Sequence, residues 1–191
     1  MSFPFVIDNL SRRLADVLNE ILEQSVDRPL DIATAYFSIS GYRILTDGLH
    51  KLGAFRLLLG TDPQSGADLG LKVDPNALKA RFKGDLEAEP FTQETLKLVE
   101  NLIAYLQAEK VQIRLFDKGF LHAKAYLFHQ DKIGPQNVAD RMRPFAAIVG
   151  SSNFTGPGLA TNRELNLVHR VFLPTDDPRD ADASRGVGYL G

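Results

Sequence analysis

Leu121-His122-Ala123-Lys124-Ala125-Tyr126-Leu127-Phe128 alternates strictly between two sets of side chains, which predicts a β-strand. Because successive side chains of a strand point to opposite faces, His122 and Lys124 share one face. An imidazole and an ammonium group side by side suit attack on a phosphate, since the ring can act as nucleophile while the ammonium holds anionic oxygens. The alternative is an edge strand with a polar, solvated face.

A second segment favours the phosphate site. Residues 145–149 are apolar and predict a buried strand, which ends in Gly150-Ser151-Ser152-Asn153. A turn of this composition presents N–H groups, hydroxyls and an amide, all suited to binding phosphate oxygens. Another strand is then predicted to begin in Asn162-Arg163-Glu164-Leu165-Asn166, which brings the Glu164 carboxylate near the site. A carboxylate that accepts one ring N–H of a histidine fixes which nitrogen of the ring carries the proton.

Strands and helices alternate in the first half of the chain, whereas the second half is rich in strands. Helical spacing of apolar residues predicts helices over 8–24, capped by Asp8 or Asn9, over 40–52 and over 92–107. The predicted strands cover 30–37, 55–59, 111–116, 121–128, 145–149 and 164–172. This order predicts an α/β fold with a mixed central sheet and helices on both faces.

Composition is ordinary for a globular protein, with 191 residues, 44% hydrophobic and 24% charged. We expect one domain over 1–173, followed by a linker or tail over 174–191, which is rich in Asp, Pro and Gly. No apolar run approaches the roughly 20 residues of a membrane span. The start lacks a basic, apolar signal segment, so a cytoplasmic location is expected. The net charge of −2 does not indicate a strongly basic nucleic-acid binder, and the absence of cysteine excludes disulfides.

His122-x-Lys124, Gly150-Ser151-x-Asn153 and Glu164 together resemble the phospholipase D superfamily, the HKD phosphodiesterases. The resemblance is closest to its nuclease-like branch, which includes metal-independent restriction endonucleases and the phospholipase D-like domains at the N-terminus of bacterial helicases. It is specific over 120–172 and weaker over 35–41 and 56–60. The fuller motif continues with four residues and an Asp, but His129 occupies that position. This departure favours the nuclease-like branch over lipid phospholipases, and it also fits a degenerate site.

The resemblance implies a phospholipase D-like fold and a mechanism that needs no metal or cofactor. One histidine attacks phosphorus and a second, from another H-x-K, protonates the leaving oxygen. This chain has one H-x-K, because in His50-Lys51 and His169-Arg170 the two residues are adjacent. An active enzyme is therefore expected to be a homodimer. The implied roles are His122 as nucleophile and acid, Lys124 and Asn153 as phosphate-holding groups, Ser151 or Ser152 as an added hydrogen-bonding group, and Glu164 as the group that orients His122. Tyr36 is either near this site or packed in the core.

Two functions remain open at this point. The first is a metal-independent nuclease acting on nucleic acid, DNA rather than RNA, as the N-terminal module of a helicase or restriction-type protein. The second is a non-catalytic module for nucleic-acid binding or dimerisation, with a degenerate site. A lipid phospholipase is disfavoured by the small size, the single motif and the lack of an amphipathic basic membrane segment.

Overall fold

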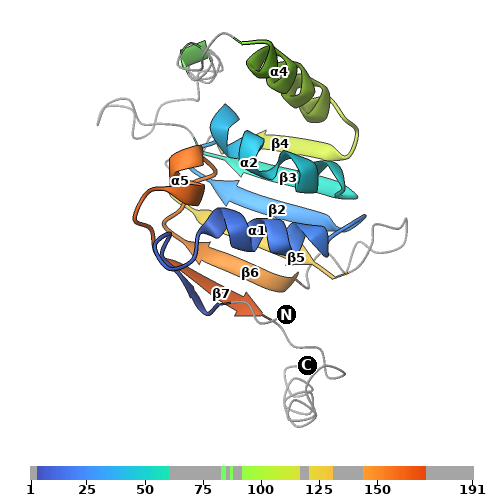
Figure 1. The fold of residues 1–191 in the computed structure, drawn as a ribbon. Helices are drawn as coiled ribbons and strands as arrows, with labels where there is room; N and C mark the ends of the chain where they lie inside the picture. The colour runs from blue at the N-terminus through green and yellow to red at the C-terminus, as the bar shows by residue number, and fades with distance from the viewer. Residues whose placement is uncertain are drawn as a thin grey trace.

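The structure, a computed structural model, describes residues 4–60, 83–84, 87, 92–116, 121–130 and 144–170. Within these ranges the chain forms a seven-stranded sheet in the order β1-β7-β6-β5-β2-β3-β4 (Figure 1). The strands are β1 (Val6–Ile7), β2 (Pro29–Thr34), β3 (Ala54–Leu59), β4 (Val111–Leu115), β5 (Lys124–His129), β6 (Pro144–Gly150) and β7 (Asn166–Arg170). The helices are α1 (Leu14–Glu23), α2 (Ile39–His50), α4 (Gln93–Leu106) and α5 (Gly156–Ala160).

The sheet is mixed because its two halves are connected differently. Strands β2, β3 and β4 are parallel, and α2 and α4 lie in the connections between them. Strand β5 runs antiparallel to β2, and β5, β6 and β7 form an antiparallel series. Parallel neighbours need long crossovers, whereas antiparallel ones need short turns. The predicted α/β fold with a mixed sheet is therefore confirmed.

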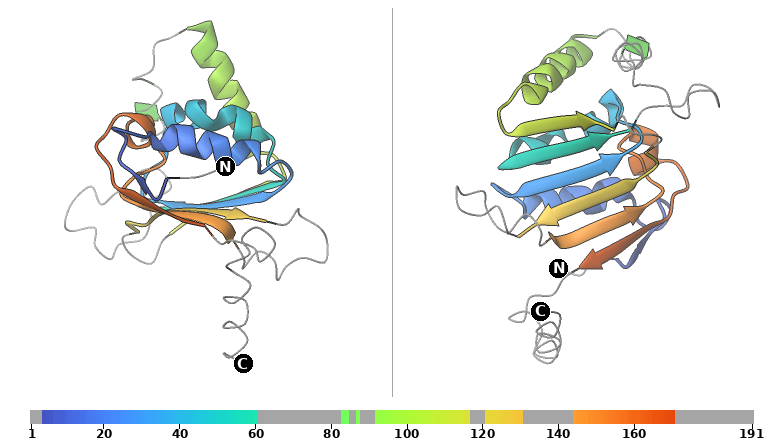
Figure 2. Two further views of the ribbon diagram at one scale, coloured as in Figure 1. Left: turned by 60° about the horizontal axis from the view of Figure 1, so that its bottom comes forward. Right: turned by 180° about the vertical axis from the view of Figure 1, so that it is seen from behind.

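All described helices pack on the same side of the sheet (Figure 2). They cover the strand face that carries residues such as Phe55, Leu57 and Ile148, each at most 3% exposed. The opposite face is half-open, because Val149 and Leu167, which are cross-strand partners, are 54% and 47% exposed. Helices on both faces were predicted, but the described residues place them on one face only. The physical reason is the strands' alternation, which gives each strand one fully buried side and one partly exposed side.

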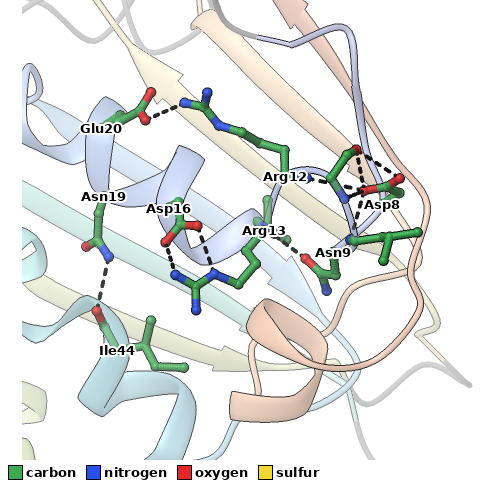
Figure 3. A network of polar contacts seen from close by, with 11 residues as sticks. Asp8, Asn9, Arg12, Arg13, Asp16, Asn19, Glu20 and Ile44 are labelled. Atoms are coloured by element: carbon green, nitrogen blue, oxygen red, sulfur yellow. Dashed lines mark hydrogen bonds and ion pairs between the residues drawn. The ribbon is translucent and has the colours of Figure 1, made fainter.

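The start of α1 differs from the sequence prediction, since the helix begins at Leu14 rather than near Asp8. Asp8 instead accepts the N–H groups of Leu10 and Ser11 at 2.9 Å in a local turn (Figure 3). Asn9 is in the left-handed region with φ 56°, and its Oδ1 accepts the Leu14 N–H at 2.7 Å. A short polar side chain tolerates that conformation, which lets Asn9 cap the helix from five residues upstream.

Replacement of Asp8 by asparagine is expected to lower the thermal stability of the protein at pH 7. The backbone N–H groups of Leu10 and Ser11 hold the pKa of Asp8 at about 2, below its ordinary 3.8. A pKa that folding lowers stabilises the folded state above about pH 4, and this contribution is lost as the pH falls toward 2. Melting curves of both proteins from pH 7 to pH 2 should therefore converge. A difference in melting temperature that stays constant over this range would contradict the prediction.

Several predictions fall outside the described residues. These are the tail over 174–191, the domain end at residue 173 and the last part of the strand predicted over 164–172. Among the helices of the described ranges, none is both long enough and apolar enough to cross a membrane.

Candidate active site

The predicted site residues gather at one end of the strands, which we call the site edge. Strands β2 and β6 end at this edge and the antiparallel strands β5 and β7 begin there, next to α5 (Figure 1). The 151–153 turn follows β6, and Glu164 precedes β7. Segments that are more than 100 residues apart in the sequence thus meet near the His122-x-Lys124 motif because of the strand order.

Lys124 is the first residue of β5 and is only 5% exposed. It is the cross-strand partner of Thr34, the last residue of β2. Its Nζ donates a hydrogen bond to the carbonyl oxygen of His122 at 3.0 Å. Burial lowers the pKa of Lys124, and the nearby Glu164 carboxylate opposes that shift. The site therefore holds a lysine whose charged form is disfavoured by burial and favoured by the neighbouring carboxylate.

His122 is exposed and lies two residues before β5, so the predicted strand begins later than its alternation indicated. The segment that carries it crosses the end of β3 closely. A Cβ on Gly60 would lie 2.7 Å from the Leu121 carbonyl oxygen and 3.0 Å from the Ala35 Cα. A glycine is thus needed at this position to let the two backbones approach. Together with the hydrogen bond from Lys124 to the His122 carbonyl oxygen, this crossing holds the backbone of residues 121 and 122, from which the exposed His122 side chain projects.

Asn153 is held by groups that come from the end of β2. Its Oδ1 accepts the Tyr36 backbone N–H at 3.2 Å and lies 3.3 Å from the Thr34 hydroxyl, which can donate to it. Since a backbone N–H is always a donor, this contact identifies which end of the amide is oxygen. The Nδ2 group is then the end that can donate to a bound phosphate. Tyr36 contacts Asn153 through its backbone N–H, and its side chain is half-buried, so the choice between a place near the site and a place in the core stays open.

The two serines of the turn have different environments. Ser151 is exposed, donates its hydroxyl proton to Glu164 and accepts the Leu165 N–H at 3.0 Å. Ser152 is fully buried, and its hydroxyl accepts a hydrogen bond from Asn166 Nδ2 at 2.8 Å. The prediction that Ser152 binds substrate is therefore corrected, because its side chain points into the protein and holds the turn. Ser151 stays a candidate.

The turn is held to β7 and β5 by contacts that the sequence patterns did not predict. Asn166 also accepts the Ser152 N–H at 3.3 Å, and the Tyr126 hydroxyl donates to the Ser152 carbonyl at 3.0 Å. A Cβ on Gly150 would lie 2.2 Å from the Leu165 carbonyl oxygen, so glycine permits this close approach. Asn166 lies at a buried position of β7, on the same face as Val168, and a polar residue at such a position was the available signal for these contacts.

Glu164 is half-buried and lies close enough to Lys124 to affect its pKa. Its described hydrogen bond comes from Ser151. The role predicted for Glu164, which is to orient His122, stays a prediction.

His129 does not belong to this edge. It ends β5, roughly 17 Å along the strand from Lys124 at about 3.4 Å per residue. Its Nε2 lies 2.9 Å from the Asp31 carboxylate, which also pairs with Arg56. The residue at the usual Asp position of the motif is therefore a buried member of a separate polar cluster with Asp31 and the partly exposed Arg56, and it lies away from the predicted phosphate site.

In the described part of the chain, no three His, Asp or Glu side chains are grouped in a way that could hold a metal ion.

Comparison with known proteins identifies the family of this chain. A family model described as "Cardiolipin synthase, PLD-like domain" matches residues 20–171. A search of curated proteins found no match. Among solved structures, NucT from Helicobacter pylori is similar at 12% identity with a TM-score of 0.45, covering 95% of this chain and 90% of that one. Nuc from Salmonella typhimurium is similar at 12% identity with a TM-score of 0.40, over 91% and 80% of the two chains. A polyphosphate kinase from Porphyromonas gingivalis is similar at 16% identity with a TM-score of 0.44, over 96% and 25%.

The matched range contains the His122 and Lys124 pair, the turn after β6 and Glu164. The chain therefore belongs to the phospholipase D superfamily, as a PLD-like domain.

Proposed function

We propose that this protein is a metal-independent phosphodiesterase that cleaves nucleic acid, DNA rather than RNA, through a phosphohistidine on His122. The observation that carries the proposal is the burial of Lys124 at the site edge, where the residue as a whole is 5% exposed. Burying a cation is unfavourable, and the contacts of Lys124 with the His122 carbonyl oxygen and the nearby Glu164 carboxylate keep it at this position, so a lysine retained beside an exposed histidine supports an anionic substrate. The nucleic-acid substrate is inferred from the motif itself, in which His129 replaces the Asp.

The proposed reaction has two steps. A ring nitrogen of His122 attacks phosphorus, so that an N–P bond forms and the P–O bond to the leaving oxygen breaks. The imidazolium of a second histidine protonates that oxygen. The resulting imidazole then takes a proton from water, the water oxygen attacks phosphorus, and the N–P bond breaks to release a phosphomonoester. Lys124 and Asn153 Nδ2 stabilise the non-bridging oxygens, with Ser151 as a further donor.

The second histidine is proposed to be His122 of another copy of the chain. The chain has four histidines, and all of them lie in the described ranges. His50 ends α2, His129 binds Asp31, and His169 lies three residues into β7. None of these three is at the edge that carries His122, so we propose a homodimer with two such sites facing across a two-fold axis.

The surroundings of the domain are also part of the proposal. The Asp-, Pro- and Gly-rich composition of 174–191 supports an N-terminal module of a longer helicase or restriction-type protein. The net charge of −2 supports the same view, because partner domains would then supply much of the affinity for DNA.

The wild-type protein is expected to hydrolyse bis-p-nitrophenyl phosphate, and to cleave DNA, in the presence of EDTA. Light scattering on the same sample is expected to give the mass of a dimer, since one chain supplies one histidine. A strict monomer that cleaves both substrates would overturn the homodimeric site. Salt-dependent binding of DNA with no hydrolysis of either substrate would instead support the non-catalytic binding module.

A further inference from the structure

Thr34 connects the end of β2 to the turn that carries Asn153. It is fully buried, and Asn153 lies 119 positions further along the chain. Its hydroxyl lies 2.9 Å from the Tyr36 carbonyl oxygen and 3.3 Å from Asn153 Oδ1, and it accepts the Phe154 N–H at 3.1 Å. Sequence patterns gave no role to this residue.

A threonine hydroxyl has one proton to donate and two lone pairs that accept. Here the proton has two acceptors within reach, the Tyr36 carbonyl and Asn153 Oδ1. The lone pairs face two backbone donors, the Phe154 N–H at 3.1 Å and the Tyr36 N–H at 3.4 Å. A single buried hydroxyl therefore contacts both segments between which the Asn153 amide is held.

The two ends of an asparagine amide have nearly the same shape, so hydrogen bonds alone decide which end faces the substrate. The Tyr36 N–H requires the oxygen of the Asn153 amide to face it, but only while the backbone at Tyr36 and the turn at Asn153 keep their spacing. Thr34 contacts both of them, and it has no exposed surface with which to touch a substrate.

We propose that Thr34 is a positioning residue that holds the Asn153 amide with Nδ2 directed at the substrate phosphate. The proposal rests on the proposed phosphodiesterase function. Thr34 acts on the reaction through Asn153, because a donor that is misplaced by about 1 Å loses much of its effect on the transition state. This role also accounts for the presence of a polar residue, Thr34, at the buried end of β2.

The test uses Thr34→Val, which keeps the shape of the side chain but lacks the hydroxyl, and Thr34→Ser, which keeps the hydroxyl. The kcat of T34V for bis-p-nitrophenyl phosphate in EDTA should fall by roughly 10- to 100-fold, whereas KM should change less. T34S should recover most of the lost kcat. Recovery by serine distinguishes the hydroxyl from the packing of the methyl group, which both threonine and valine possess.

A second measurement does not depend on activity. In ¹⁵N spectra the side-chain NH₂ signals of Asn153 are assigned as the pair that Asn153→Asp removes. They should form one sharp pair in the wild type and T34S, and should shift, broaden or double in T34V. If T34V does not fold, Thr34→Cys provides the same readouts, because a thiol forms much weaker hydrogen bonds. The chain has no other cysteine to pair with it.

The outcomes separate the two proposals. Unchanged NH₂ signals and an unchanged kcat in T34V would overturn the role of Thr34 and leave the proposed function intact. Loss of kcat that T34S does not recover, with unchanged NH₂ signals, would also overturn it. Absence of hydrolysis by the wild type would overturn the proposed function, while the NH₂ signals would still decide whether Thr34 holds the amide.

Discussion

The His122→Ala variant is expected to hydrolyse bis-p-nitrophenyl phosphate in EDTA at least about 10³-fold more slowly than the wild type. In the proposed mechanism His122 is the nucleophile in one subunit and the acid in the other, and general acid–base catalysis alone contributes roughly 10²- to 10⁴-fold. One substitution in a homodimer removes both functions. The side chain is exposed, so the melting temperature should stay close to that of the wild type.

The matched control is His169→Ala. His169 is also an exposed histidine, but it lies on β7, away from the edge that carries His122. Its replacement should leave both the rate and the melting temperature nearly unchanged. Hydrolysis by H122A at the wild-type rate, in protein purified free of other phosphodiesterases, would rule out His122 as the nucleophile.

The Lys124→Met variant is expected to lose activity while gaining stability. Removal of one group that stabilises a developing anion typically costs about 10²- to 10³-fold in kcat. Burial, however, lowers the pKa of Lys124, which means that the folded protein disfavours the charged form. Methionine has a similar length and no charge to desolvate, so it should fill the same space more favourably.

The gain in stability should depend on pH in a defined direction. A lysine whose pKa is lowered by folding destabilises the folded state while it is protonated, and this penalty is relieved as the pH rises through the lowered pKa toward the ordinary 10.5. The melting temperature of K124M should thus exceed that of the wild type most clearly near pH 7, and the two should converge in alkali. Lys97→Met, at an exposed position on α4, is the control that should change neither property. A K124M protein that is active, or less stable than the wild type at pH 7, would contradict the prediction.

Local patterns were sufficient for most of the sheet. Apolar runs and period-two alternation predicted β2, β3, β4, β6 and the body of β5, because the alternation follows directly from backbone geometry. The same patterns failed at the ends of elements. Strand β5 begins at Lys124 rather than Leu121, and α1 begins at Leu14 because Asp8 and Asn9 form a turn of their own. Such ends depend on hydrogen bonds of single side chains, which compete with the regular pattern.

The motif residues themselves were identified from the sequence, but their surroundings were not. Ser151 and Ser152 cannot be distinguished in the sequence, because they are neighbouring residues of the same type. In the structure the Ser152 hydroxyl is buried against Asn166 on β7, whereas Ser151 is exposed. The second helical layer was predicted from a general rule for α/β proteins, whereas the described helices lie on one face.

The sequence by itself determined the superfamily, the strand that carries Lys124 and the count of one H-x-K in each chain, because these depend on residue types and short spacings. The tertiary structure decided which side chains support that motif. It placed Thr34 beside Asn153 and His129 beside Asp31, at opposite ends of the pairing between β2 and β5. Contacts between segments roughly 100 residues apart follow from strand order and register. Those are set by packing of the whole sheet and by no local pattern in the chain.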